Sequence, residues 1–317
     1  KNRKGLANWL FSPDHPLTAR VAVNRYWQMI FGRGIVATPE DFGSQGALPT
    51  HPQLLDWLAI EFQESGWNLK QLLKLMVMSS TYRQSAAIPA GLQEKDPDNL
   101  LFARGPQVRL TAEQIRDHAL AISGLLSDKR GGPSVKPYQP QGLWLQVASG
   151  NQSLRKYIQD HEEDLYRRSL YTFWKRTIPP PSMTVFDAPS REQCSIKRRT
   201  TSTPMQALVL LNDPQFTEAA RLMAQRMLEE GGEQAENRIA YAFKWATSRS
   251  PVAKEVDILL RLLEEELSAF ATDPDAANRL LSIGEIPIAK RQNVTELAAY
   301  TVLASAILNL TESIHKS

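Results

Sequence analysis

The sequence contains a single cysteine, Cys194, among 317 residues. One cysteine excludes an internal disulfide and a cysteine-rich metal site. It also excludes a covalently attached haem, because the CxxCH attachment motif requires two cysteines. Cys194 lies near Lys197 and Arg198, which favour a reactive thiolate. No histidine lies close to it in the chain, so we interpret Cys194 as a buried or incidental thiol.

Motifs typical of several enzyme classes are also missing. No GxGxxG, Walker A or GxSxG pattern occurs, so nucleotide binding and serine hydrolase chemistry lack support. The five histidines show no HExxH or other paired spacing, and we predict no metal site. The run HEED at 161–164 has oxygen ligands for a hard cation, but it is more typical of a solvated helix start.

No apolar run approaches the ~20 residues that span a bilayer. The longest uncharged stretch, Leu297–Leu310, contains Tyr300, Thr301, Ser305 and Asn309, and we predict a buried helix there. The N-terminal KNRKGLANWL has basic residues but no long apolar segment, so it is not a signal peptide. The sequence thus predicts no membrane span.

Charge is unevenly distributed, although the net charge is only +3. Residues 167–201 contain eight basic and two acidic residues, whereas residues 203–317 contain 11 basic and 16 acidic ones. The basic stretch either attracts an anionic partner or neutralises the acidic C-terminal part within the fold. Both interpretations are open from the sequence.

Helical signals are frequent along the chain. Apolar residues recur at helical spacing, as in Val23, Trp27 and Phe31. The segments TAEQ at 111–114 and TPMQ at 203–206 match the capping box. Pairs of Ser, Thr or Asp with a following Pro fit helix N-caps, and they begin at Ser12, Thr38, Asp96, Thr203, Asp213, Ser250 and Asp273.

The fold class that these patterns predict is all-α, with many helices in two packed lobes, long irregular loops and at most a short β pair. Its best strand candidate is RRSLYTFWKR at 167–176, which is rich in aromatic residues. The irregular regions are 129–152 and 177–202. We expect an N-terminal lobe at 1–202, including the basic irregular segment 177–202, and a C-terminal lobe at 203–317. Met183, Val185 and Phe186 predict that the second irregular region is packed rather than solvated.

The most charge-dense segment is FDAPSREQCSIKRRTTSTP at 186–204. Asp187 and Glu192 are candidates for an acid/base pair of the kind that glycoside chemistry uses. Arginines such as Arg176, Arg191 and Arg198 suit an anionic ligand. The alternative, which we prefer, is an internal network of arginines and carboxylates that organises the loop.

Two tryptophans flank the irregular regions, and three polar residues share an early helix. Trp144 and Trp174 are candidates to stack a sugar ring or a haem edge, although both also suit a core. Arg20, Asn24 and Arg25 are interpreted as structural polar residues of that helix. For Arg25 we expect a carboxylate partner and name Glu192 or Asp187.

Three long stretches resemble a known family in the same order along the chain. They are NRYWQMIFGRGIVATPEDFGSQGALPTHPQLLDWLAIEFQESGWNLKQLLKLMVMSSTYRQS at 24–85, RSLYTFWKRTIPPPSMTVFDAPSREQCSIKRRTTSTPMQALVLLNDPQFTEAARLMA at 168–224 and ELAAYTVLASAILNLTE at 296–312. They are similar to the domain of unknown function DUF1553, also called PSD1. The resemblance implies a C-terminal domain of large exported proteins of planctomycetes and related bacteria, with a cytochrome-c-like domain and a second uncharacterised domain upstream.

The resemblance sets the functional expectations, because the family supplies no catalytic residues to carry over. It implies a C-terminal fragment of an exported, periplasmic or cell-envelope protein, with haem c in an upstream part and the upstream domains as partners. We expect a binding or scaffold domain that supports a redox or polysaccharide-handling assembly, with glycan as a further partner. The alternative is an enzyme acting on an anionic or complex carbohydrate through Asp187 and Glu192. Nucleic-acid binding is not expected, because the basic residues do not follow one long helix.

Overall fold

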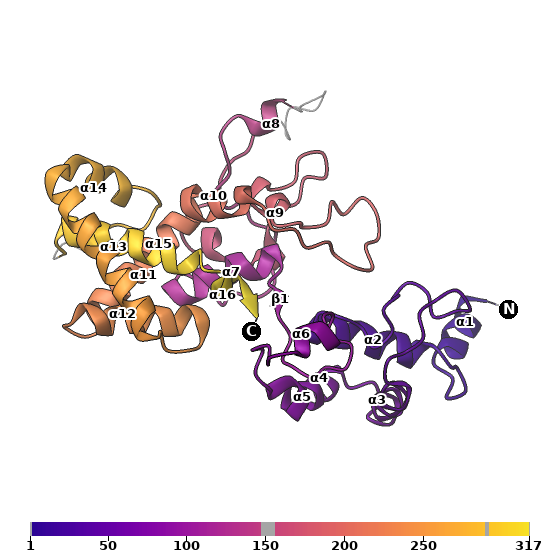
Figure 1. Cartoon of the computed structure of the whole chain (residues 1–317). Coiled ribbons are helices and arrows are strands. Elements are labelled where there is room, and N and C mark those ends of the chain that lie inside the picture. Colours follow the sequence, from indigo (N-terminus) through magenta and orange to yellow (C-terminus); the bar gives the residue numbers. More distant parts are fainter. Residues whose placement is uncertain (1, 147–155, 289–291, 317) are drawn as a thin grey trace. The chain divides into compact units, whose positions relative to one another are not determined.

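The computed structural model describes residues 2–146, 156–288 and 292–316 (Figure 1). The described chain is built from helices and loops, which confirms the all-α prediction. Its one sheet pairs two short strands, β1 (Val108–Arg109) and β2 (His315–Lys316). In these residues no helix is both long and apolar enough to cross a membrane.

The chain divides into two compact units between Val108 and Arg109. Unit 1 contains residues 2–108 with 315–316, and unit 2 contains residues 109–314. The sequence had suggested a boundary near residue 202 instead. The difference arises because Ile122 belongs to the same apolar core as Ala220 and Met223, so the middle of the chain folds with the C-terminal helices.

Unit 1 is a set of helices around one apolar core. The predicted face of its second helix is confirmed, since Val23, Trp27 and Phe31 are all buried in that core. Phe31 stacks on Trp27 with ring centroids 4.0 Å apart. The helices are α1 (Arg3–Leu10), α2 (Thr18–Phe31), α3 (Pro52–Glu64), α4 (Leu69–Met78), α5 (Ser80–Arg83) and α6 (Leu92–Lys95).

Unit 2 is centred on two long helices, α11 (Pro214–Glu230) and α15 (Val294–Leu308). Small buried residues on both helices, such as Ala220 and Ala298, allow close approach. The uncharged stretch near the C-terminus therefore forms a buried helix, as predicted. The remaining helices are α7 (Ala112–Ser123), α8 (Leu143–Gln146), η2 (Glu162–Tyr166), η3 (Ser169–Tyr171), α9 (Pro181–Val185), α10 (Pro204–Asn212), α12 (Ala235–Thr247), α13 (Ala253–Thr272), α14 (Pro274–Leu281) and α16 (Thr311–Ile314).

The N-cap predictions hold for α7, α10, α11 and α14. Thr111 and Gln114 form the predicted capping box of α7, and Asp213 caps α11 through the amide of Gln215 at 3.0 Å. Four pairs were wrong: no helix begins at Ser12, Thr38 or Asp96, and α13 begins at Ala253 with Val252 rather than Ser250 as its N-cap. Asp96 instead accepts from the amides of Leu100 and Leu101 after α6 has ended, a local turn that uses the same chemistry.

The predicted strand at 167–176 is also wrong. Ser169–Tyr171 forms the short 3-10 helix η3, and only isolated bridges connect Arg167 to Ser127 and Thr172 to Val135. The buried Arg167 guanidinium donates to the carbonyls of Pro133 and Gly131. These side-chain bonds replace the continuous ladder that a strand would need.

The two irregular regions differ in how far they are packed. Residues 147–152 of the first region lie outside the described residues. In the second, Met183 and Phe186 are buried around α9, but residues 190–205 are all exposed. The expectation of a packed segment therefore holds for its beginning only, because the apolar residues are concentrated there.

Candidate functional site

Asp187 closes a loop that we call the basic loop, defined as residues 188–200. The Asp187 carboxylate accepts from the Arg109 guanidinium at 2.6 Å and from the Thr201 amide at 2.8 Å. The Thr201 hydroxyl donates to the same carboxylate at 3.0 Å. Because Asp187 and Thr201 lie on either side of the loop in the chain, these bonds hold its two ends together.

Arg109 and Gln206 strengthen this closure from neighbouring elements. The Arg109 side chain is 5% exposed, and it donates to the carbonyls of Phe186 and Thr201 as well. The Gln206 amide, at the start of α10, donates to the Val185 carbonyl at 3.0 Å and to the Thr201 hydroxyl at 3.3 Å. The loop base is thus a hydrogen-bonded network joining β1, the end of α9 and α10.

The ionisation of Asp187 follows from these contacts. Partial burial raises the pKa of Asp187, but the hydrogen bonds from Thr201 and Arg109 outweigh it and leave the pKa below its usual value. The carboxylate is therefore charged at neutral pH. A general acid needs the opposite, a carboxyl that keeps its proton.

Trp174 and Arg191 hold the first part of the basic loop. The Trp174 indole N–H donates to the Ser190 carbonyl at 3.0 Å. The Arg191 guanidinium lies 4.4 Å from the centroid of the Trp174 ring, a cation–π contact. One face of the ring is therefore covered by the loop itself, so a sugar stacking on that face would have to displace Arg191.

Arg198 anchors the second part of the loop to α7. Its guanidinium donates to both carboxylate oxygens of Glu113, at 2.6 and 3.2 Å. Burial raises the pKa of Glu113, but the bonds from Arg198 and its other partners bring the pKa below its usual value. Such a forked pair fixes orientation as well as distance, so this part of the loop is also tethered.

The other charged residues of the loop face solvent. Glu192, Lys197 and Arg199 are exposed, and in the described part of the chain their side chains have no hydrogen-bond or ion-pair partner. Arg176 is exposed before the loop, and the Cys194 thiol is exposed within it. The structure thus brings Asp187, Trp174, Arg191 and Arg198 into one framework. It leaves Glu192 on the outer surface, in surroundings unlike those of Asp187.

Trp144 is placed elsewhere and is buried. Its side chain is 3% exposed, and its ring packs edge-on against Tyr157 with centroids 5.1 Å apart. The Lys175 ammonium lies 4.3 Å from its centroid, and Phe173 packs against it too. Trp144 therefore belongs to a local core and has no free face for a sugar or a haem edge.

The three polar residues predicted on the early helix lie in unit 1, where two of them make specific contacts. Asn24 is fully buried and pairs with the backbone of Val36, at 2.8 Å as acceptor and 3.0 Å as donor. Arg20 donates to Asp56 at 2.6 Å. Arg25 is exposed, and the Asp187 carboxylate, one of its two expected partners, pairs with Arg109.

A second polar network surrounds Glu218, which is fully buried on α11. Its carboxylate accepts from the amides of Glu285 and Ile286 at 2.7 and 2.8 Å, and from the hydroxyls of Tyr138 and Tyr166 at 2.9 and 3.1 Å. Burial, and then the charge of Glu218, raises the pKa of both tyrosines above the usual value. With this many donors the carboxylate is a structural centre rather than a reactive one.

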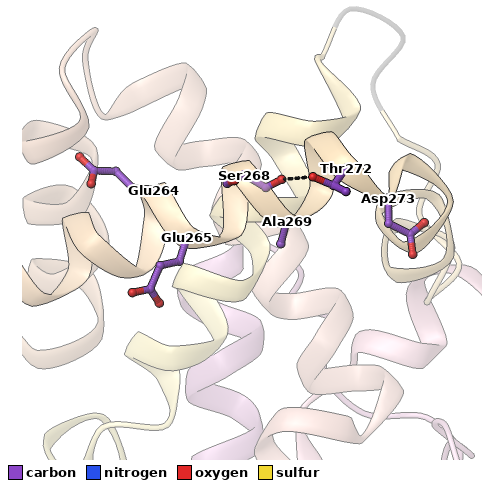
Figure 2. Close-up of a pocket in the computed structure, with 6 residues that line it drawn as sticks. All are labelled: Glu264, Glu265, Ser268, Ala269, Thr272 and Asp273. Atoms are coloured by element: carbon purple, nitrogen blue, oxygen red, sulfur yellow. Dashed lines mark hydrogen bonds between the residues drawn. The ribbon is translucent and has the colours of Figure 1, made fainter.

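Two further kinds of site are a metal cluster and a surface groove. Within residues 2–146, 156–288 and 292–316, no cluster of histidine, cysteine and carboxylate side chains is arranged to hold a metal ion. His161 instead pairs with Glu285. A shallow open groove of about 690 Å³ runs along α13 to the start of α14 (Figure 2), and it contains none of the predicted site residues. It is lined by Glu264, Glu265, Ser268, Ala269, Thr272 and Asp273.

The partners that hold the basic loop from β1, α7 and α10 were not among the predicted site residues. Arg109 and Glu113 flank the capping residue Thr111. The capping-box pattern predicts the helix start, but it does not predict the ion pairs that these two residues form. Glu218 was missed as well, although it follows Phe216 and precedes Ala219 on an apolar helix. A charged residue on a face that is otherwise apolar is a usable signal, because burial of such a group requires partners.

Comparison with known proteins agrees with the resemblance noted in the sequence. The model of a family described as a protein of unknown function (DUF1553), PSD1, matches residues 2–263. Neither the curated proteins nor the solved structures gave a match to this chain. The matched range covers all of unit 1 up to Val108, the basic loop and α10 to α12. The chain therefore belongs to the PSD1 (DUF1553) family.

Proposed function

We propose that this chain is a binding domain and that the basic loop receives an anionic partner. The observation that carries the proposal is the contrast between tethered and free charges in one loop. Asp187, Arg191 and Arg198 fix the loop in place, whereas Lys197 and Arg199 are exposed. A loop held this firmly loses little conformational freedom when a partner binds its free cations.

Catalysis by Asp187 and Glu192 has less support. Asp187 is occupied by Arg109 and Thr201, and its pKa is lowered rather than raised. Glu192 is exposed on the outside of the loop. Glycoside hydrolysis needs one carboxyl that keeps its proton, beside a second carboxylate across a cleft. A binding role requires only the exposed cations.

The proposed setting of this function is the one that the resemblance implies. The resemblance supports an exported domain of the cell envelope that stands beside a haem-carrying, cytochrome-like domain in its parent protein. Anionic partners in that setting include uronic or sulfated glycans and acidic surfaces of neighbouring domains. In this proposal the chain acts as a scaffold in a redox or polysaccharide-handling assembly.

The test is binding of the purified chain to a sulfated glycan, a polyuronate and a neutral glycan of similar length over a salt series. We expect the two anionic glycans to bind, with affinity falling as salt rises, and the neutral one not to bind. The double variant Lys197→Ala/Arg199→Ala should weaken binding about tenfold. Arg261→Ala, which removes an exposed arginine of α13, is the matched control and should bind like the wild type.

Absence of binding to both anionic glycans would overturn the proposal, and so would either of two further results. One is equal binding of neutral and anionic glycans, and the other is binding to anions that Arg261→Ala reduces as much as the loop variant does. Glu192→Gln tests whether the net charge of the loop governs binding. It should bind anions at least as well as the wild type, because it removes a negative charge from the loop.

A further inference from the structure

The helix that follows the basic loop has an apolar outer face. In α10, Met205, Leu208 and Leu211 are 56%, 51% and 44% exposed. Their spacing of three residues places them next to one another along one side of the helix. Gln206 and Leu210 on the opposite side are buried and attach the helix to unit 2.

The fold does not account for this outer face. A surface helix normally has an apolar inner side and a polar outer side, and here both sides are apolar. Leu208 and Leu211 lie outside the apolar core that holds α10, whereas Leu210 belongs to it. Contiguous exposed apolar side chains of this size are typical of interaction surfaces.

The helix that presents this apolar face is joined to the base of the basic loop. The Gln206 side chain bonds to the Thr201 hydroxyl, so the first turn of α10 and the loop base form one unit. Ile196 adds a further apolar side chain within the loop, 47% exposed. The free cations Lys197 and Arg199 lie a few residues before α10, whose N-terminus adds a partial positive charge.

We propose that the outer face of α10 and the basic loop together form a docking surface for an acidic amphipathic polypeptide segment. This inference rests on the proposed function, because it names the partner of the same loop. Charge complementarity selects an acidic partner, and the row of Met205, Leu208 and Leu211 selects one with large apolar side chains. A helix with apolar residues on one face and carboxylates beside them meets both requirements. An anionic polysaccharide meets only the first.

The experiment compares three probes on the full chain. The first is a synthetic helical peptide of Glu and Leu, with leucines at positions i, i+3, i+4 and i+7. The second is a peptide of the same composition with the leucines scattered around the helix, and the third is polyglutamate of equal charge. We expect the amphipathic peptide to bind about tenfold more tightly than either of the others.

Variants separate the two parts of the surface. Leu208→Gln should remove most of the advantage of the amphipathic peptide and leave polyglutamate binding unchanged. Leu170→Gln, at a leucine that is 75% exposed on η3, should change neither. Lys197→Ala/Arg199→Ala should weaken all three probes. Thermal unfolding of each variant checks that a loss of affinity is not a loss of fold.

The outcomes distinguish this inference from the proposed function. If no polyanion binds, the proposed function fails and this inference fails with it. If polyglutamate and a sulfated glycan bind but the amphipathic peptide has no advantage, only the docking surface is rejected. A sulfated glycan that binds far more tightly than the amphipathic peptide, with no effect of Leu208→Gln, assigns the loop to a polysaccharide.

Discussion

Arg109 and Asp187 form an ion pair at 2.6 Å although they lie far apart in the sequence. The pair is mostly buried, with side-chain exposures of 5% and 18%. Arg109 precedes the cap of α7 and Asp187 follows α9, so one contact joins two helices and closes the basic loop. Asp187, which the sequence offered as a candidate acid/base residue, therefore has a structural role at the base of the candidate site.

Removal of the Asp187 carboxylate should open the loop. In Asp187→Ala, the Arg109 guanidinium and the Thr201 amide both lose their acceptor, and we expect unfolding to become easier by about 2 kcal/mol. Chemical denaturation measures this change, and limited proteolysis within 188–200 should become faster. Glu192→Ala is the control and should leave both quantities unchanged, because Glu192 is exposed. Equal effects of the two substitutions would contradict the structural role of Asp187.

The sequence predicted contacts between residues close together in the chain better than contacts between residues far apart. Short-range patterns were reliable: the capping box of Thr111 and the buried face of Val23 and Trp27 follow from spacing within one helix. The partners of Asp187 and Arg198 were not predictable, because each lies many residues away and is selected by the tertiary path of the chain. The burial of Trp144 was not predictable for the same reason, since it depends on contacts with Tyr157 and Lys175.

Asp213 should make stability depend on pH. Burial raises the pKa of Asp213 to about 6, although the amide of Gln215 opposes the shift. Between about pH 4 and pH 6 the folded protein therefore binds more protons at this site than the unfolded chain does. Its contribution to stability is complete below pH 4 and is lost as the pH rises through 6.

The Asp213→Asn variant tests this dependence while it keeps an N-cap acceptor for the Gln215 amide. Relative to wild type, the variant should gain stability on the order of 2 kcal/mol between pH 4 and pH 6. Denaturation of both proteins across this range measures the difference, in which the other titrating groups cancel. Parallel stability curves would show that Asp213 titrates near its ordinary value.

Gly284 should be among the least replaceable residues of unit 2. Its φ is +100°, and a Cβ built there would lie 2.3 Å from the Glu218 carboxyl carbon. Gly284→Ala would displace the loop whose amides satisfy the buried Glu218. We expect a loss of roughly 4 kcal/mol or failure to fold.

Gly142→Ala separates backbone strain from this clash. Gly142 also has a positive φ, +75°, but a Cβ there would meet nothing within 4 Å. Its cost should be only about 1 kcal/mol, the usual penalty for a left-handed conformation. Thermal unfolding of the two variants measures the difference. Similar losses of stability would argue against close packing of Gly284 against the Glu218 carboxylate.

Asn24 should be a stability determinant of unit 1, whereas its neighbour Arg25 should not be. The Asn24 amide is fully buried and makes two hydrogen bonds to the backbone of Val36, holding the turn after α2. Asn24→Ala leaves a buried N–H and C=O unpaired and should cost about 2–4 kcal/mol.

Arg25→Ala removes an exposed side chain and should change stability by less than about 0.5 kcal/mol. Chemical denaturation of the two variants and the wild type measures both changes. A large effect of Arg25→Ala would mean that this arginine has a partner outside the residues described, whereas a small effect of Asn24→Ala would mean that water replaces the amide.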